Sequence, residues 1–133
     1  MFVNLIETDQ VHGHRHDVEG FHRALREIDS AVARLLAQMR GDDLLIVTAD
    51  HGVDPTRAGS DHTREYAPLL AASGEMMRGR TPTDGASVRG PTRRAGAETG
   101  ARRHDGPLAD VGATALRWLS GRDSALAGQA FLS

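Results

Sequence analysis

The stretch Leu44-Leu45-Ile46-Val47-Thr48-Ala49-Asp50-His51-Gly52 decides the fold expected for this chain. Its four consecutive aliphatic residues are typical of a parallel strand that is buried on both faces. An acid and an imidazole, Asp50 and His51, follow the apolar run, and functional groups gather at the carboxyl ends of strands in open α/β sheets. Asp-His-Gly also suits a plain turn at a strand exit. The stretch therefore predicts a buried strand that ends either in a site or in a simple turn.

The residues before this strand predict a strand and a helix. The apolar residues 2–6 are typical of a short buried strand. Asp17 is a candidate N-cap for a helix over residues 18–39, whose apolar residues recur every three or four positions, and Gly41 is its expected end. Strand, helix and strand in this order indicate a βαβ unit. The predicted fold class is α/β, a mostly parallel sheet flanked by helices.

The rest of the chain predicts three further segments. Residues 66–72 are expected to form a strand, with Pro68 near an edge or a strand start. Residues 75–105 are rich in Gly, Arg, Thr and Pro and are interpreted as a flexible insertion. Pro107 is expected to open a last helix that Gly121 ends. The predicted organisation is a metal-binding core at 1–74, the insertion at 75–105, and a helix and tail at 106–133 that complete the core.

Composition and charge indicate the size of the domain and the partners and metal ligands to be expected. The chain has 133 residues, enough for one modest domain, and its net charge of −2 gives no reason to expect a nucleic-acid partner. It has no cysteine, so a metal would have to be bound by histidine and carboxylates. It has no apolar run long enough to cross a membrane, and residues 1–6, which lack a basic region and a cleavage site, are not expected to be a signal peptide. We therefore expect no membrane association and a cytoplasmic location.

A set of acids and imidazoles follows two of the predicted strands. Neighbouring parallel strands would bring these groups to one edge of the sheet, and the loop after the second strand can fold over that edge. The candidate ligands are Asp9, His14, Asp50, His51 and His62. This donor set suits manganese or zinc, and magnesium less well, because imidazole is a poor magnesium ligand. The other histidines are interpreted as non-ligands: His12 and His16 as flanking groups, and His22 and His104 as solvated ones.

Several of these motifs resemble a known family. Asn4-Leu5-Ile6, the block from Asp9 to Asp17 containing Gly-His-Arg-x-Asp, Thr48–Pro55 and the block Asp61-His62-Thr63-Arg64-Glu65-Tyr66 are together similar to the C-terminal part of phosphopentomutases. These enzymes belong to the alkaline-phosphatase-like metalloenzyme superfamily. Residues 108–114 and 130–132 also resemble that family's last helix and tail.

The resemblance implies two metal ions, usually manganese. Asp9, His14 and His62 match the ligands of one ion, and Asp50 and His51 match two ligands of the other. It implies a pentose phosphate substrate and interconversion of ribose 1-phosphate and ribose 5-phosphate, or of the deoxy forms. Metal affinity should decrease as the pH is lowered through the range where histidine protonates, because a protonated imidazole cannot bind a metal. Arg15 and Arg64 are candidates for phosphate contacts, with an ordinary salt bridge as the alternative.

The resemblance also implies parts that have no counterpart in these 133 residues. They are the first strand with its metal-binding Asp, the threonine nucleophile and the inserted cap domain. We therefore expect a fragment with little activity of its own. The alternatives are a metal-binding remnant that a companion polypeptide completes, a non-catalytic α/β module, and a fragment of another superfamily member such as cofactor-independent phosphoglycerate mutase.

Overall fold

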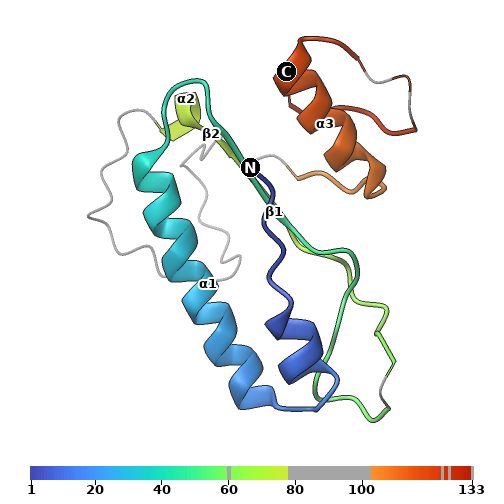
Figure 1. The fold of residues 1–133 in the computed structure, drawn as a ribbon. Helices are drawn as coiled ribbons and strands as arrows, with labels where there is room; N and C mark the ends of the chain where they lie inside the picture. The colour runs from blue at the N-terminus through green and yellow to red at the C-terminus, as the bar shows by residue number, and fades with distance from the viewer. Residues whose placement is uncertain (60, 78–102, 124, 126, 133) are drawn as a thin grey trace, which may run out of the picture. The chain divides into compact units, whose positions relative to one another are not determined.

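The computed structural model describes residues 1–59, 61–77, 103–123, 125 and 127–132. The chain divides into two compact units, Met1–Arg78 and Gly79–Ser133, and each is described here by itself. Within the described residues, no helix has the length and apolar character needed to cross a membrane. Figure 1 shows the elements of both units.

The first unit begins with a π-helical turn and a long helix. The turn η1, Thr8–Gly13, packs against the helix α1, Val18–Gln38. The side chain of Asp17 accepts a hydrogen bond from the Gly20 amide, which confirms Asp17 as the N-cap. The helix ends three residues before Gly41, and Met39 is its C-cap.

Two strands form the sheet of this unit. β1, Leu44–Thr48, pairs with β2, Leu69–Ser73, and the two strands are antiparallel. Leu44 lies opposite Ser73 and Thr48 opposite Leu69, and the Thr48 hydroxyl donates to the Pro68 carbonyl at 2.9 Å. The sheet of the described residues is thus not parallel, because the connection between its strands is a loop that doubles back. A parallel pair would need a crossover, usually a helix.

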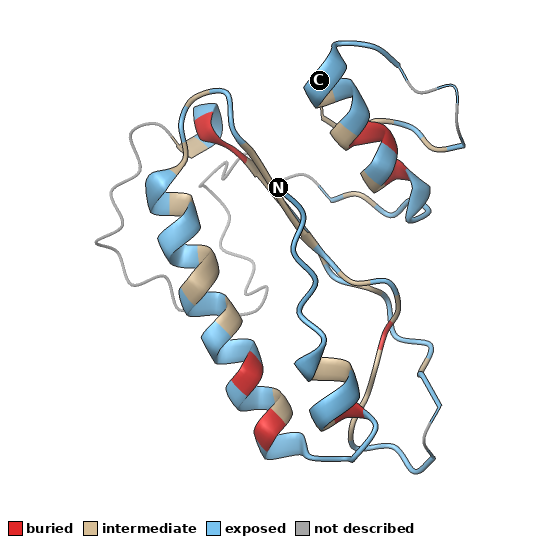
Figure 2. Cartoon of the chain, in the orientation of Figure 1, coloured by how far each residue is buried: buried red, intermediate tan, exposed pale blue. Residues whose placement is uncertain are grey.

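The predicted strand at residues 2–6 is wrong for this structure, because these residues form no strand. Their side chains are exposed, and Phe2 retains 93% of its accessible surface. Half-exposed apolar side chains also remain on α1, including Leu25 and Leu35 (Figure 2). The structure is therefore a mixed α/β arrangement in which much of the apolar surface is not covered by described residues.

A short helix follows the second strand. α2, Gly74–Met77, starts one residue before the predicted flexible insertion and runs into it, so residues 75–77 are helical rather than irregular. The buried Gly74 approaches the backbone of Arg40 too closely for any side chain. Its amide donates to the Asp43 carbonyl at 2.8 Å. Most of the predicted insertion, residues 78–102, lies outside the described residues.

The second unit is built on one helix, α3, Ala109–Ser120. It begins two residues after Pro107, and Gly121 ends it as predicted, with a φ of 67° that is typical of a left-handed glycine cap. Thr114 is fully buried, and its hydroxyl donates to the Asp110 carbonyl and accepts from the Phe131 amide. Asp110 is buried too, and its carboxylate accepts from the Gln129 amide and pairs with His104. The tail of the chain is thus held on the helix by polar contacts.

Candidate metal centre

The turn η1 brings Asp9 and His14 together. The His14 amide donates to the Asp9 carbonyl at 3.0 Å, a hydrogen bond that spans five residues and defines the π-helical turn. The two side chains then lie on the same side of the turn, with His14 Nε2 3.4 Å from Asp9 Oδ2. No helical turn was predicted for residues 8–13 from the sequence. The π-helical turn puts the two expected ligands side by side.

The loop after β1 brings His51 and His62 together. The Thr63 amide donates to the Gly52 carbonyl at 3.3 Å in an isolated antiparallel bridge. The imidazole rings of His51 and His62 consequently stack, with their centroids 3.6 Å apart and their planes inclined by 19°. A side chain at Gly52 would overlap the backbone of Glu65, so glycine is needed for this close approach.

Asp9, His51 and His62 form one cluster. Each offers a ligand atom, and these three atoms lie within 4.8 Å of one another. His62 Nε2 is 3.6 Å from Asp9 Oδ1. The ring of His14 is also close, with its centroid 5.0 Å from that of His62. Four of the five predicted ligands therefore meet around the Asp9 carboxylate.

The geometry of the cluster suits a shared cation better than direct hydrogen bonds. Asp9 Oδ1 is buried and has no hydrogen-bond partner among the described residues, which is costly for a carboxylate oxygen. The contacts of 3.4 and 3.6 Å from imidazole to carboxylate are long for hydrogen bonds. Two atoms bound to one ion at about 2.1 Å lie about 3.0 to 3.4 Å apart, so the contact from His14 matches this spacing and the contact from His62 is slightly longer. The residues present thus fit a divalent ion at Asp9.

His51 is oriented by its own neighbour. Its Nδ1 lies 3.2 Å from the Gly52 carbonyl, which can only accept, so Nδ1 carries the proton. The lone pair is then on Nε2, the nitrogen that lies 3.5 Å from Asp50 Oδ1. Imidazole ligands of metals are commonly fixed by a hydrogen bond of this kind.

Asp50 lies at the edge of the cluster. Its side chain is 83% exposed, and its carboxylate contacts His51 rather than Asp9. The predicted phosphate contacts, Arg15 and Arg64, are both exposed; Arg15 directly follows His14, and Arg64 lies two residues after His62. The structure thus places Asp50 next to the second imidazole and leaves both guanidinium groups open to solvent.

Two contacts around the cluster were not predicted from the sequence. Gly13 is buried, and a Cβ there would lie 3.1 Å from a methyl group of Val53, so glycine lets η1 pack on the loop after His51. His12 Nδ1 lies 2.9 Å from Asp17 Oδ2, and its side chain is only 14% exposed. The sequence signal for the second contact was a histidine five residues before a helix N-cap.

Comparisons with known proteins agree with this chemistry. The sequence profile of the metalloenzyme superfamily matches residues 1–121. The phosphopentomutase of Herpetosiphon aurantiacus is 40% identical over 133 residues, which is all of this chain and 29% of that enzyme. The phosphopentomutase of Caldanaerobacter subterraneus subsp. tengcongensis is 50% identical over 80 residues, 60% of this chain and 20% of that enzyme.

A third relative shows a similar pattern. The phosphopentomutase of Symbiobacterium thermophilum is 53% identical over 70 residues, 53% of this chain and 18% of that enzyme. The chain thus spans less than a third of the length of the curated relatives that it matches. The match over residues 1–121 covers most of its own length. The chain belongs to the metalloenzyme superfamily, and its resemblance to phosphopentomutases is confirmed.

Proposed function

We propose that this chain is the metal-binding part of a phosphopentomutase-type isomerase, which interconverts ribose 1-phosphate and ribose 5-phosphate or their deoxy forms. The observation that carries the proposal is the buried, unpartnered Oδ1 of Asp9 with His51 and His62 around it. The identity of 40% to 53% with curated phosphopentomutases supports the choice of reaction. The complete domain would carry the mostly parallel sheet of the α/β class and work in the cytoplasm.

The five candidate ligands divide between two ions in this proposal. Asp9, His14 and His62 bind one ion, and Asp50 and His51 contribute to the other. The close approach of His51 to Asp9 and His62 would keep the two ions adjacent. Manganese is the preferred ion, with zinc next, because three imidazoles disfavour magnesium. When bound, such ions offset the charge of a transferring phosphoryl group and activate an oxygen.

The residues of this chain have defined tasks in the proposal. The Asp9 carboxylate supplies negative charge between the imidazoles, and His51 is held by Gly52 in the tautomer that leaves Nε2 to the metal. Arg15 and Arg64 are exposed and carry guanidinium groups that suit the phosphate of a pentose phosphate substrate. The threonine nucleophile and the remaining ligand would come from a companion segment, which would also cover apolar side chains such as Phe2.

A turnover experiment tests this function. The chain is combined with a polypeptide that carries the missing strand, nucleophile and cap, and manganese and ribose 1-phosphate are added. Phosphorus NMR should show ribose 5-phosphate only when both parts are present. The same mixture with Asp9→Asn is the control and should be inactive. Metal binding without turnover would support the non-catalytic remnant, and turnover of a phosphoglycerate alone would support the phosphoglycerate mutase alternative.

A further inference from the structure

Two hydrogen bonds join His12 to Asp17 across the turn that carries His14. The Asp17 amide donates to the His12 carbonyl at 3.0 Å, and the His12 Nδ1 lies 2.9 Å from Asp17 Oδ2. The second carboxylate oxygen of Asp17 accepts from the Gly20 amide at 2.9 Å, which fixes it to the first turn of α1. Residues 13–16 are therefore enclosed between two residues that bind each other through both backbone and side chain.

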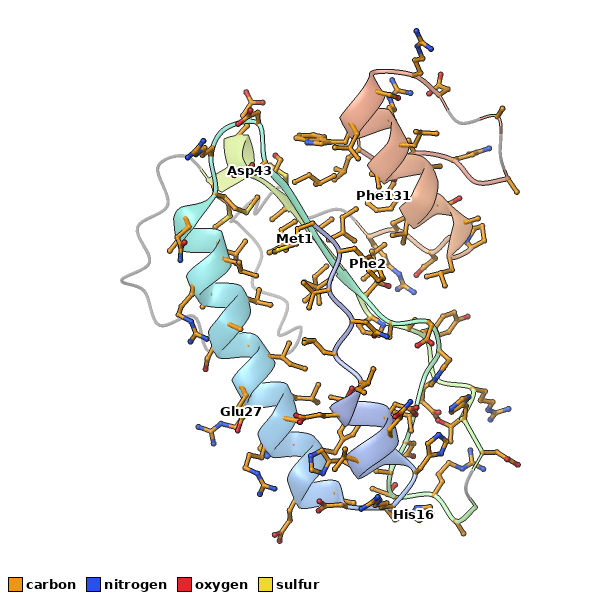
Figure 3. All side chains as sticks on the ribbon, viewed as in Figure 1. Met1, Phe2, His16, Glu27, Asp43 and Phe131 are labelled. Atoms are coloured by element: carbon orange, nitrogen blue, oxygen red, sulfur yellow. The ribbon has the colours of Figure 1, made fainter. Side chains whose placement is uncertain are left out.

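His16 attaches the same turn to the loop that follows His51. Among the described residues, His16 is the non-glycine residue with a positive φ, which is 55°. This conformation is uncommon for a residue with a Cβ. Its Nδ1 lies 3.3 Å from the Pro55 carbonyl, thirty-nine residues away in the sequence. Figure 3 shows His16 in the turn between η1 and α1. The turn that carries His14 is thus linked to the segment that carries His51.

We propose that His12 and Asp17 form a clasp that holds His14 in position for the metal. Both are positioning residues rather than ligands, and His16 links the clasped turn to the loop of His51. This inference rests on the proposed metal centre. Its physical basis is preorganisation: a histidine whose backbone is already fixed loses less conformational freedom when it binds a cation. Losing a contact that orients a ligand commonly lowers metal affinity by about 10- to 100-fold.

Gly20 lies directly against both side chains of the clasp. A Cβ at this position would overlap both Asp17 Oδ2 and the His12 ring, so alanine would push the two side chains apart. Alanine at a helical position otherwise favours the helix over glycine. Gly20→Ala should therefore break the clasp and also disturb the Asp17 cap, whereas His12→Ala breaks the clasp and leaves the hydrogen bond from the Gly20 amide to Asp17 in place. Weaker metal binding in both variants points to the clasp, which they share, rather than to the cap.

The experiment measures manganese affinity by calorimetry in the wild type, His12→Ala, His12→Asn and Gly20→Ala. Asparagine can donate from a position close to Nδ1, so His12→Asn should keep near wild-type affinity. His12→Ala and Gly20→Ala should bind about 10- to 100-fold more weakly. His22→Ala, an exposed change on α1, is the matched control and should have no effect. Wild-type affinity in both His12→Ala and Gly20→Ala would overturn the clasp.

Hydrogen exchange provides a second measurement that does not need the metal. The amides of His14 and Asp17 donate to backbone carbonyls across the turn, and they should exchange faster in His12→Ala than in the wild type and His12→Asn. If the wild type binds no manganese, the proposed function fails, and exchange alone decides on the clasp. Unchanged exchange of the His14 amide in His12→Ala would then overturn it.

Discussion

The imidazole rings of His51 and His62 stack at a centroid distance of 3.6 Å, although eleven residues separate them in the sequence. The hydrogen bond from the Thr63 amide to the Gly52 carbonyl holds the two segments together beside the rings. The bridge therefore sets the distance between two proposed ligands. A change that opens it should act on the metal centre without removing a ligand.

Gly52→Ala should weaken manganese binding by about 10-fold or more. The added Cβ would overlap the backbone of Glu65, so the bridge must open and His62 must move away from His51. Calorimetric titration of manganese into both proteins measures the change. An affinity equal to that of the wild type would show that the bridge does not set the geometry of the centre.

Gly112→Ala should stabilise the second unit by about 0.5 to 1 kcal/mol. Gly112 is exposed within α3, and among the described residues outside the helix's own backbone no atom lies within 4 Å of an added Cβ. Urea unfolding followed by the fluorescence of Trp118, the single tryptophan, reports on this helix. A loss of stability would contradict the open environment that the structure gives this glycine.

Thr114→Val should destabilise the second unit by about 1 to 3 kcal/mol. Valine keeps the volume of the fully buried side chain but leaves the Phe131 amide without the acceptor that holds the tail. The same fluorescence measurement applies. Ser120→Ala is the control, because that hydroxyl is exposed: it donates to the Leu116 carbonyl of its own helix and accepts from the nearby Arg122 amide, where water can take its place. Equal effects of the two changes would contradict the role of Thr114.

Asp17 should make the stability of the first unit depend on pH in the acidic range. The hydrogen bond from the Gly20 amide, and then that from His12, lower the pKa of Asp17 in the folded chain below the ordinary value of 3.8. The unfolded chain therefore binds the proton more readily. The contribution of Asp17 to the free energy of unfolding is fully present above the pKa that Asp17 has in the unfolded chain. It is lost as the pH falls through the lower pKa that Asp17 has in the folded chain.

Asp17→Asn tests this dependence, because asparagine can still accept from Gly20 but does not ionise. The unfolding free energies of the two proteins, measured in urea from about pH 6 to about pH 2.5, should converge as the pH falls. A difference that stays constant over this range would contradict the lowered pKa of Asp17.

Local signals predicted α1, α3 and β1 well. Asp17 caps α1, Gly121 ends α3, and the run of four aliphatic residues forms most of β1. Each depends on residues near one another in sequence. The second strand starts three residues later than predicted, directly after Pro68, because proline has no amide to donate to the ladder.

Strand pairing could not be predicted in the same way. The apolar pattern of residues 2–6 suits a strand, but a strand needs a partner, and pattern alone does not supply one. The π-helical turn at Thr8–Gly13 was missed because its polar residues and its glycine are typical of a loop. The sequence identified Asp9 and the three imidazoles around it, but not the turn, the bridge and the clasp that position them.

Manganese binding by the wild type and by His62→Ala tests the central claim most directly. The account predicts that wild-type protein binds manganese and that His62→Ala binds it at least about 10-fold more weakly, since one imidazole beside Asp9 Oδ1 is gone. His22→Ala, remote from the cluster on the exposed side of α1, should bind as the wild type does. Equal affinities for the wild type and His62→Ala, or no binding by either protein, would contradict a metal centre built on Asp9.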